Sequence, residues 1–185
     1  MNRKLILIGG YCATGKSTFS RRLSERVGFL CLNKDTLKEV VADTLGDMIE
    51  RSYNSTLSIT ATRLMIHAAQ RSMAAGQPLI LESNFRPHEV NELGAMADAS
   101  RYACLTYLFT APLPLCYDRY YAREGTPERH WVHASVEGMD FETFRKGHVP
   151  FGEIELGQMV RVDAADFSAI DYEALFQVAE GFAIE

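Results

Sequence analysis

The segment Gly10-Tyr11-Cys12-Ala13-Thr14-Gly15-Lys16-Ser17 follows a short apolar run and precedes an amphipathic one. It is a complete GxxxxGK[ST] pattern, in which glycines allow a tight turn and bring successive backbone N–H groups toward phosphate oxygens. The helix expected over residues 16–27 adds its positive N-terminal end at the same point. A chance match in a chain of this length has a frequency on the order of one per cent. The segment therefore predicts a phosphate-binding loop.

This loop pattern also predicts roles for individual side chains. Lys16 is expected to place its ammonium group against the β and γ phosphates of a nucleotide, and the Ser17 hydroxyl to complete the shell of a magnesium ion. ATP and Mg²⁺ are therefore the expected cofactors. The residues of this region predicted to bind the nucleotide are Gly10, Thr14, Gly15, Lys16, Ser17 and Thr18.

Short apolar runs alternate with longer amphipathic ones along the rest of the chain. Residues 4–9 are typical of a strand buried on both faces, because their apolar side chains follow one another with little interruption. Strands separated by helices indicate an α/β fold with a parallel sheet between two layers of helices. Further strands are predicted at 29–32, 78–81, 102–109 and 158–162, and further helices at 35–45, 57–75, 87–99, 112–121 and 172–182.

Size and charge limit the classes of partner. A chain of 185 residues with 47% hydrophobic and 23% charged residues predicts one domain over residues 1–185. The net charge is −5, and residues 150–185 hold one arginine against eight carboxylates, so the preceding part carries +2. Proteins that bind long DNA have a much stronger basic excess. The charge pattern favours a small anionic ligand.

Two further features concern the environment of the protein. The four cysteines are dispersed and include no CxxC pair, which favours a reduced, cytoplasmic protein. No apolar run approaches the ~20 residues that cross a bilayer, so no membrane role is predicted.

Asp35 is the candidate for a catalytic base. It lies just beyond the second predicted strand, and in a parallel sheet the end of that strand opens onto the crevice where ligands bind. A carboxylate at this place can accept a proton from an attacking hydroxyl. The alternative is that Asp35 is only the N-cap of the helix at 35–45, and the two roles can coexist.

A polar cluster follows the third predicted strand. Glu82 stands where an acidic residue reaches the magnesium shell, directly or through water, or binds the acceptor. Asn84 and Arg86 follow it and are expected to face the same crevice as acceptor-binding residues. The alternative for all three is capping of the strand end.

Arginines recur after the fourth predicted strand. Arg119 and Arg123 are four residues apart and share one helix face, and Arg129 follows on a loop bounded by Gly125 and Pro127. Guanidinium groups closing over a γ phosphate would neutralise its charge and exclude water. Solvated surface arginines are the alternative.

With these residues assembled, the chain resembles the small P-loop kinases of the nucleoside-monophosphate-kinase-like group. It is most similar to the branch of polynucleotide kinase, zeta-toxin and chloramphenicol-phosphotransferase-like proteins. The resemblance implies a three-layer P-loop fold with a five-stranded parallel sheet of order 2-3-1-4-5. It also implies an acceptor-activating Asp at Asp35, an acceptor contact at Lys38 and an arginine-bearing lid at approximately 119–135. In this lid Arg119 binds the nucleotide, while Arg123 and Arg129 join Lys16 and Asp35 as catalytic residues.

The expected activity is transfer of the ATP γ phosphate to a hydroxyl of a small-molecule acceptor. Two alternatives stay open, namely a polynucleotide 5′-hydroxyl kinase and a non-catalytic ATP-binding or ATPase module. The sequence leaves open the identity of the acceptor, the preference for ATP or GTP, the oligomeric state, and which lid arginine contacts the γ phosphate.

Overall fold

The computed structural model describes residues 3–48, 53–127, 129–133 and 139–184. Five parallel strands form one sheet in the order β2-β3-β1-β4-β5. This confirms the predicted α/β fold and strand order. The strands are β1 (Lys4–Gly10), β2 (Leu30–Asn33), β3 (Leu79–Glu82), β4 (Ala103–Thr110) and β5 (Gln158–Asp163).

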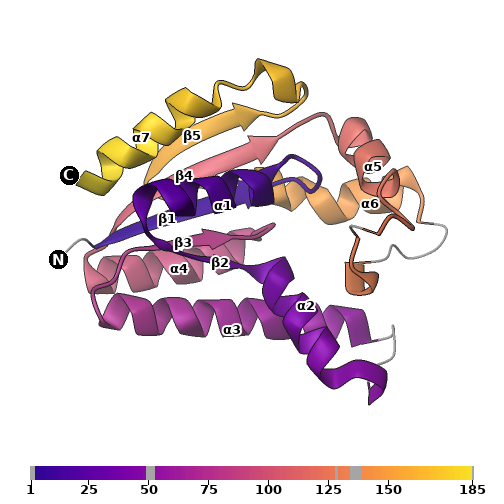
Figure 1. Ribbon diagram of the computed structural model, residues 1–185, viewed down its shortest axis with the longest axis horizontal. Helices are drawn as coiled ribbons and strands as arrows, with labels where there is room; N and C mark the ends of the chain where they lie inside the picture. Colours follow the sequence, from indigo (N-terminus) through magenta and orange to yellow (C-terminus); the bar gives the residue numbers. More distant parts are fainter. Residues whose placement is uncertain (1–2, 49–52, 128, 134–138, 185) are drawn as a thin grey trace.

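Helices cover both faces of the sheet (Figure 1). The α-helices are α1 (Lys16–Val27), α2 (Lys34–Leu45), α3 (Asn54–Ala74), α4 (Pro87–Ser100), α5 (Leu113–Tyr121), α6 (Phe141–His148) and α7 (Tyr172–Ile184). Short 3₁₀ helices within the described ranges include η1 (Gly46–Met48), η3 (Trp131–His133), η4 (Val149–Gly152) and η5 (Phe167–Ala169).

The central strand β1 divides the core into two clusters. Ile6 and Ile8 pack with α1 and α7 on one face, whereas Leu5 and Leu7 pack with α3 and α4 on the other. Side chains of a strand alternate between faces, so a strand that is buried on both faces must be apolar throughout. This explains the uninterrupted apolar run and fixes the strand whose end carries the phosphate loop.

Three local predictions need correction. The N-cap of α2 is Asn33, whose side chain accepts a hydrogen bond from the Thr36 N–H, and not Asp35, which lies inside the first turn. Helix α3 begins at Asn54, three residues before the predicted start. Helix α6 was not predicted at all, because eight residues offer little periodicity.

Polar residues of the predicted site lie at or just beyond the carboxyl ends of the strands. Helices α2, α5 and α6 gather at this end in Figure 1. Within the described ranges, none of the helices combines the length and the apolar character needed to cross a membrane. The predicted lid region, 119–135, is described except at 128, 134 and 135, which lie outside the described residues.

Candidate active site

The phosphate loop has the backbone of an anion cradle. Gly10 ends β1 with φ of +115°, and a Cβ there would lie 2.0 Å from the carbonyl oxygen of Phe109. Only glycine therefore lets the chain turn beside β4, where the Tyr11 N–H donates to the Phe109 carbonyl at 2.9 Å. Gly15 adopts the left-handed conformation and starts α1, whose first N–H groups face the turn.

The Lys16 side chain lies on the inner side of the phosphate loop. It is almost fully buried, and its Nζ donates to the Tyr11 carbonyl at 2.5 Å. Burial lowers the pKa of Lys16, while the negative charge of Glu82 opposes that shift. The ammonium group is thus held at the centre of the turn, where it can exchange a backbone carbonyl for phosphate oxygens.

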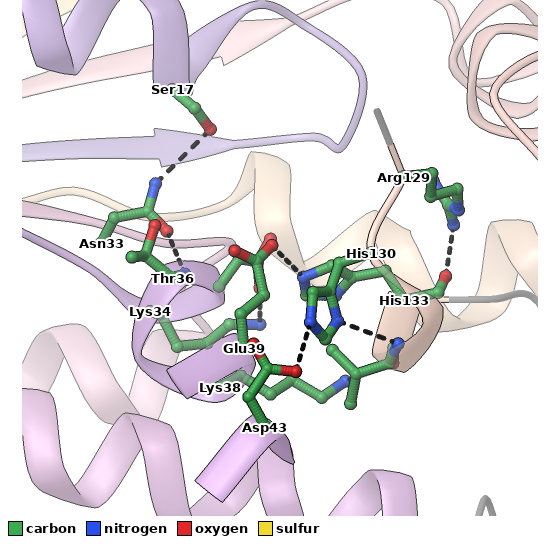
Figure 2. A network of polar contacts seen from close by, with 12 residues as sticks. Ser17, Asn33, Lys34, Thr36, Lys38, Glu39, Asp43, Arg129, His130 and His133 are labelled. Carbon is green, nitrogen blue, oxygen red and sulfur yellow. Dashed lines mark hydrogen bonds and ion pairs between the residues drawn. The ribbon is translucent and has the colours of Figure 1, made fainter. Parts of the chain in front are cut away.

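Ser17, at the start of α1, meets Asn33 and Glu82 at the ends of β2 and β3. Figure 2 shows the Asn33 side chain pointing toward Ser17. Asn33 ends β2 directly opposite Glu82 on β3, and its Nδ2 donates to Glu82 Oε2 and lies 3.5 Å from Ser17 Oγ. Burial raises the pKa of Glu82 to about 7, and the charge of Asp35 adds to this while that of Lys16 opposes it. A buried carboxylate and an exposed hydroxyl are oxygen ligands of the kind Mg²⁺ prefers.

Asp35 is not needed as a helix cap, because Asn33 caps α2. Its carboxylate instead pairs with Lys34, with Nζ 2.7 Å from Oδ1, and lines the cleft described below. Burial alone would raise the pKa of Asp35, but the positive charges of Lys34, His133 and Lys16 outweigh it and hold the pKa below its usual value. The group is therefore an ionised carboxylate at neutral pH.

Arg123 and Arg129 line the same cleft as Cys12 and the rest of the phosphate loop. Burial raises the pKa of the Cys12 thiol to about 12, and the charges of Lys16, Arg123 and Arg129 act against this shift. Arg129 pairs with Glu124 at 2.7 Å, and its guanidinium lies 4.2 Å from the centre of the Tyr120 ring. Arg123 is exposed.

Residues 130–133 pack against α2 (Figure 2). His133 Nε2 lies 2.8 Å from Glu39 Oε1, and His130 Nε2 lies 2.9 Å from Asp43 Oδ1. Lys38, which is buried, donates from Nζ to the Val132 carbonyl at 3.2 Å. The helix that carries Asp35 is thus also the surface on which this part of the lid rests.

Arg119 lies on the other side of the phosphate loop. It donates to the carbonyls of Ala164 and Ala165 at 2.6 and 2.8 Å and lies 4.1 Å from the centre of the Phe167 ring. A Cβ on Gly15 would be 3.4 Å from the same ring. Arg119 therefore flanks the entrance to the phosphate loop without contacting the region around Asp35.

One cleft of about 830 Å³ brings most of the predicted residues together. It is lined by Thr14, Gly15, Lys16, Ser17, Thr18, Asp35, Lys38, Glu82, Asn84, Arg86, Arg123 and Arg129. Gly10 and Arg119 do not line it. Gly10 shapes the turn from behind, and Arg119 lies beside η5.

The cleft also contains residues that the sequence did not single out as site residues. Among them are Asn33, Lys34, Glu39, Asn54, His148 and Phe151. Asn33 had a detectable signal, because Asn is as good an N-cap as Asp and precedes Asp35 by two residues. His148 and Phe151 lie on α6 and η4, so nothing in the sequence placed them near the loop.

Comparisons with known proteins agree with this geometry. Residues 5–141 match a family model described as an AAA domain. A candidate kinase from Chloroflexus aurantiacus is similar in structure, with a TM-score of 0.84 and 27% identity over 98% of this chain and 99% of that chain. The APS kinase of Mycobacterium tuberculosis, in complex with AMPPNP and APS, has a TM-score of 0.61 and 15% identity over 100% and 99% of the two chains. The shikimate kinase of Bacteroides thetaiotaomicron has a TM-score of 0.57 and 10% identity over 98% and 99%. A search of curated protein sequences found no match.

The fold and the loop define a small P-loop kinase of the nucleoside-monophosphate-kinase-like type, as the sequence predicted. Because the AAA-domain model matches well over half of the chain, the chain belongs to that family. The structural neighbours support ATP-dependent phosphotransfer in general.

Proposed function

We propose that the protein transfers the γ phosphate of ATP to a hydroxyl of a small-molecule acceptor. The observation that supports this most is Asp35. It is ionised, it is not used as a helix cap, and it shares one cleft with Lys16 and Ser17. A non-catalytic ATP-binding module would have no need of a carboxylate in this position.

The nucleotide would bind through the phosphate loop. The N–H groups at the start of α1 and the ammonium of Lys16 bind the phosphates. Ser17 and Glu82 are the residues that would hold magnesium, either directly or through water, with Asn33 orienting Glu82. When bound, the ion would neutralise charge on the phosphates.

Asp35 would accept the proton of the acceptor hydroxyl as the oxygen attacks the γ phosphorus. Lys34 fixes the orientation of the carboxylate through the 2.7 Å ion pair. A base placed within reach of the reacting proton contributes roughly 10²-fold to 10⁴-fold to the rate. Lys38, Asn84 and Arg86 would bind the acceptor beside it.

Arg123 and Arg129 would stabilise the charge that spreads over the oxygens of the transferring phosphoryl group. Both line the same cleft as the phosphate loop. The docking of residues 130–133 on α2 would place these arginines over the reaction while limiting access of water. Arg119 would contact the nucleotide base from beside η5.

The charge distribution supports a small acceptor rather than a polynucleotide. The chain has a net charge of −5 and no basic stripe that would follow a nucleic-acid backbone. The proposal includes no membrane partner. The four cysteines are all free, which fits a cytoplasmic enzyme.

The test is a comparison of Asp35→Asn with the wild-type protein, using γ-labelled ATP, Mg²⁺ and a panel of metabolites, antibiotics and oligonucleotides. The wild type should label a small molecule, and Asp35→Asn should lose about 10²-fold or more of that transfer while keeping its affinity for ATP. Asp98→Asn is the matched control, because Asp98 is exposed on α4. Equal transfer by Asp35→Asn and wild type would exclude the role of base.

A further inference from the structure

The cleft holds more cations than carboxylates. Its carboxylates are Asp35, Glu39 and Glu82, and its lysines and arginines are Lys16, Lys34, Lys38, Arg86, Arg123 and Arg129. An excess of positive charge in a concave site attracts anionic ligands. The nucleotide accounts for part of this excess, so the question is which cations remain once its phosphates are bound.

Four of the six cations already have a protein partner. Lys34 pairs with Asp35, and Arg129 pairs with Glu124. Lys16 and Lys38 donate to backbone carbonyls. Within the described part of the chain, Arg86 and Arg123 are the cleft cations for which the structure gives neither an ion pair nor a hydrogen bond from the side chain.

These two arginines come from different parts of the chain. Arg123 follows α5 in the predicted lid and is the one proposed above to act on the transferring phosphate. Arg86 follows β3 at the start of α4, and its guanidinium lies 5.2 Å from the centre of the Phe151 ring. Its backbone N–H bonds to Glu89, so the residue is anchored independently of its side chain. The guanidinium of Arg86 is thus positioned and available.

His148 stands beside Arg86 as a fixed hydrogen-bond acceptor. Its ring stacks on Phe144, with centroids 3.8 Å apart, and its Nδ1 donates to the Phe144 carbonyl at 2.7 Å. The His148 ring also lies 5.4 Å from the Phe151 ring, which the Arg86 guanidinium contacts as well. Burial lowers the pKa of His148, and the charges of Lys16 and Arg86 lower it further. In the neutral ring whose Nδ1 carries the proton, Nε2 is an acceptor.

A second acceptor on the cleft wall also lacks a partner. Asn54, the first residue of α3, lines the cleft, and its Oδ1 is buried without a hydrogen bond to any described residue. A buried acceptor without a partner costs roughly 1 to 3 kcal/mol, so its presence in a binding cleft indicates a group supplied by a ligand. Asn54 Oδ1 and His148 Nε2 can accept from N–H or O–H groups, and hydroxyls are the donors that a phosphate acceptor of the proposed kind carries.

We infer that the phosphate acceptor is a small hydroxylated anion, whose carboxylate or phosphate binds to Arg86 and whose hydroxyls donate to His148 and Asn54. This inference rests on the proposed function and names the class of acceptor. The guanidinium fork suits both carboxylate and phosphate, because each offers two oxygens in the spacing of its N–H groups. The Phe151 ring supports the flat face of that guanidinium.

The experiment measures binding and transfer separately. Aldonates and sugar phosphates of three to six carbons are compared with the neutral alditols of the same length and with a 5′-hydroxyl oligonucleotide. Binding is measured by calorimetry in the presence of a non-hydrolysable ATP analogue, and transfer is measured with labelled ATP. At least one anion should bind to the wild type and accept phosphate with a kcat/KM about 10-fold to 100-fold above that of its neutral counterpart. Preference for a carboxylate or for a phosphate distinguishes the two sources of charge.

Arg86→Gln should remove this preference, so that the anion is used no better than the alditol, while affinity for the ATP analogue stays unchanged. Arg86→Lys should restore part of it, because it keeps the charge and loses the fork. The matched control is Arg71→Gln, which changes an exposed arginine in the last turn of α3. Thermal unfolding checks that all three variants fold.

The outcomes separate the inference from the proposed function. Transfer to neutral alditols with no effect of Arg86→Gln overturns the inference and leaves the phosphotransferase in place. Binding of an anion through Arg86 with no transfer to it supports the anion site and contradicts the proposed function. If no anion binds, or if the oligonucleotide alone is labelled, the inference is wrong.

Discussion

The phosphate loop takes its shape from eight consecutive residues, 10–17, whereas the opposite wall of the cleft draws on elements between residues 33 and 151. In the phosphate loop, the glycine pattern and the start of α1 determine the geometry, and contacts with β4 support it. In the opposite wall, Asp35, Asn54 and His148 come from α2, α3 and α6, and Arg86 is the N-cap of α4. The geometry of the phosphate loop is determined by the local sequence, and the geometry of the opposite wall is determined by the tertiary fold.

This difference explains why the phosphate loop indicates the type of reaction, whereas the opposite wall of the cleft determines which acceptor binds. A triphosphate is recognised by backbone groups, which any chain with this loop presents in the same way. An acceptor is recognised by side chains, which vary freely on a common fold. Changes in the two regions should therefore have different consequences, and the following variants test that separation.

The largest effect is expected for Lys16→Ala in the phosphate loop. The substitution removes the buried ammonium from the turn and should lower ATP affinity by about 100-fold or more, because several charge-assisted hydrogen bonds are lost. The rate of phosphate transfer should fall for every acceptor alike. Calorimetry with ATP measures the loss, and circular dichroism should show an unchanged fold.

The control for this variant is Lys146→Ala, since Lys146 is exposed on α6. ATP affinity of Lys16→Ala within a factor of two of wild type would remove the basis for assigning the loop to phosphates.

An intermediate effect is expected for Arg129→Ala in the lid. The variant should bind ATP almost as well as wild type but lose about 10-fold to 1,000-fold in kcat, because the arginine acts on charge that develops during transfer. Steady-state kinetics with a labelled acceptor measures kcat and KM separately. Arg161→Ala is a suitable control, because that residue is exposed and pairs only with Glu155 among the ion pairs of the described chain. A rise in KM at constant kcat would show that Arg129 contributes to substrate binding and not to stabilisation of the charge that develops during transfer.

The smallest effect is expected for Asn33→Ala, at the boundary between the two regions. Loss of the N-cap of α2 should reduce the free energy of unfolding by about 1 kcal/mol. Because Asn33 also joins Glu82 and Ser17, the same variant should require a higher Mg²⁺ concentration for binding of ATP. Urea unfolding and a magnesium titration measure the two effects.

Asp140→Ala provides a matched comparison for Asn33→Ala. Asp140 caps α6 through the Thr143 N–H, as Asn33 caps α2, but it has no contact with the phosphate loop. It should lose similar stability and keep the magnesium dependence of wild type. An equal magnesium shift in both variants would show that the effect comes from helix loss alone.

The sequence predicted the parallel sheet and the phosphate loop because those features depend on local pattern and on general rules for parallel sheets, whereas the strand order was an expectation from the family resemblance. It misplaced the cap of α2 because Asn33 and Asp35 are both good caps and only the backbone decides between them. It could not predict that His133 meets Glu39 or that His130 meets Asp43, because these pairs are separated by 94 and 87 residues.

The docking of residues 130–133 on α2 has a thermodynamic consequence. Because the protein's own residues hold this segment on the helix, its conformational entropy is lost during folding and not during association. Binding of the acceptor should therefore proceed with only a small change in heat capacity from this part of the molecule. Selectivity for the acceptor would then come from a preformed surface rather than from one that changes its conformation on binding.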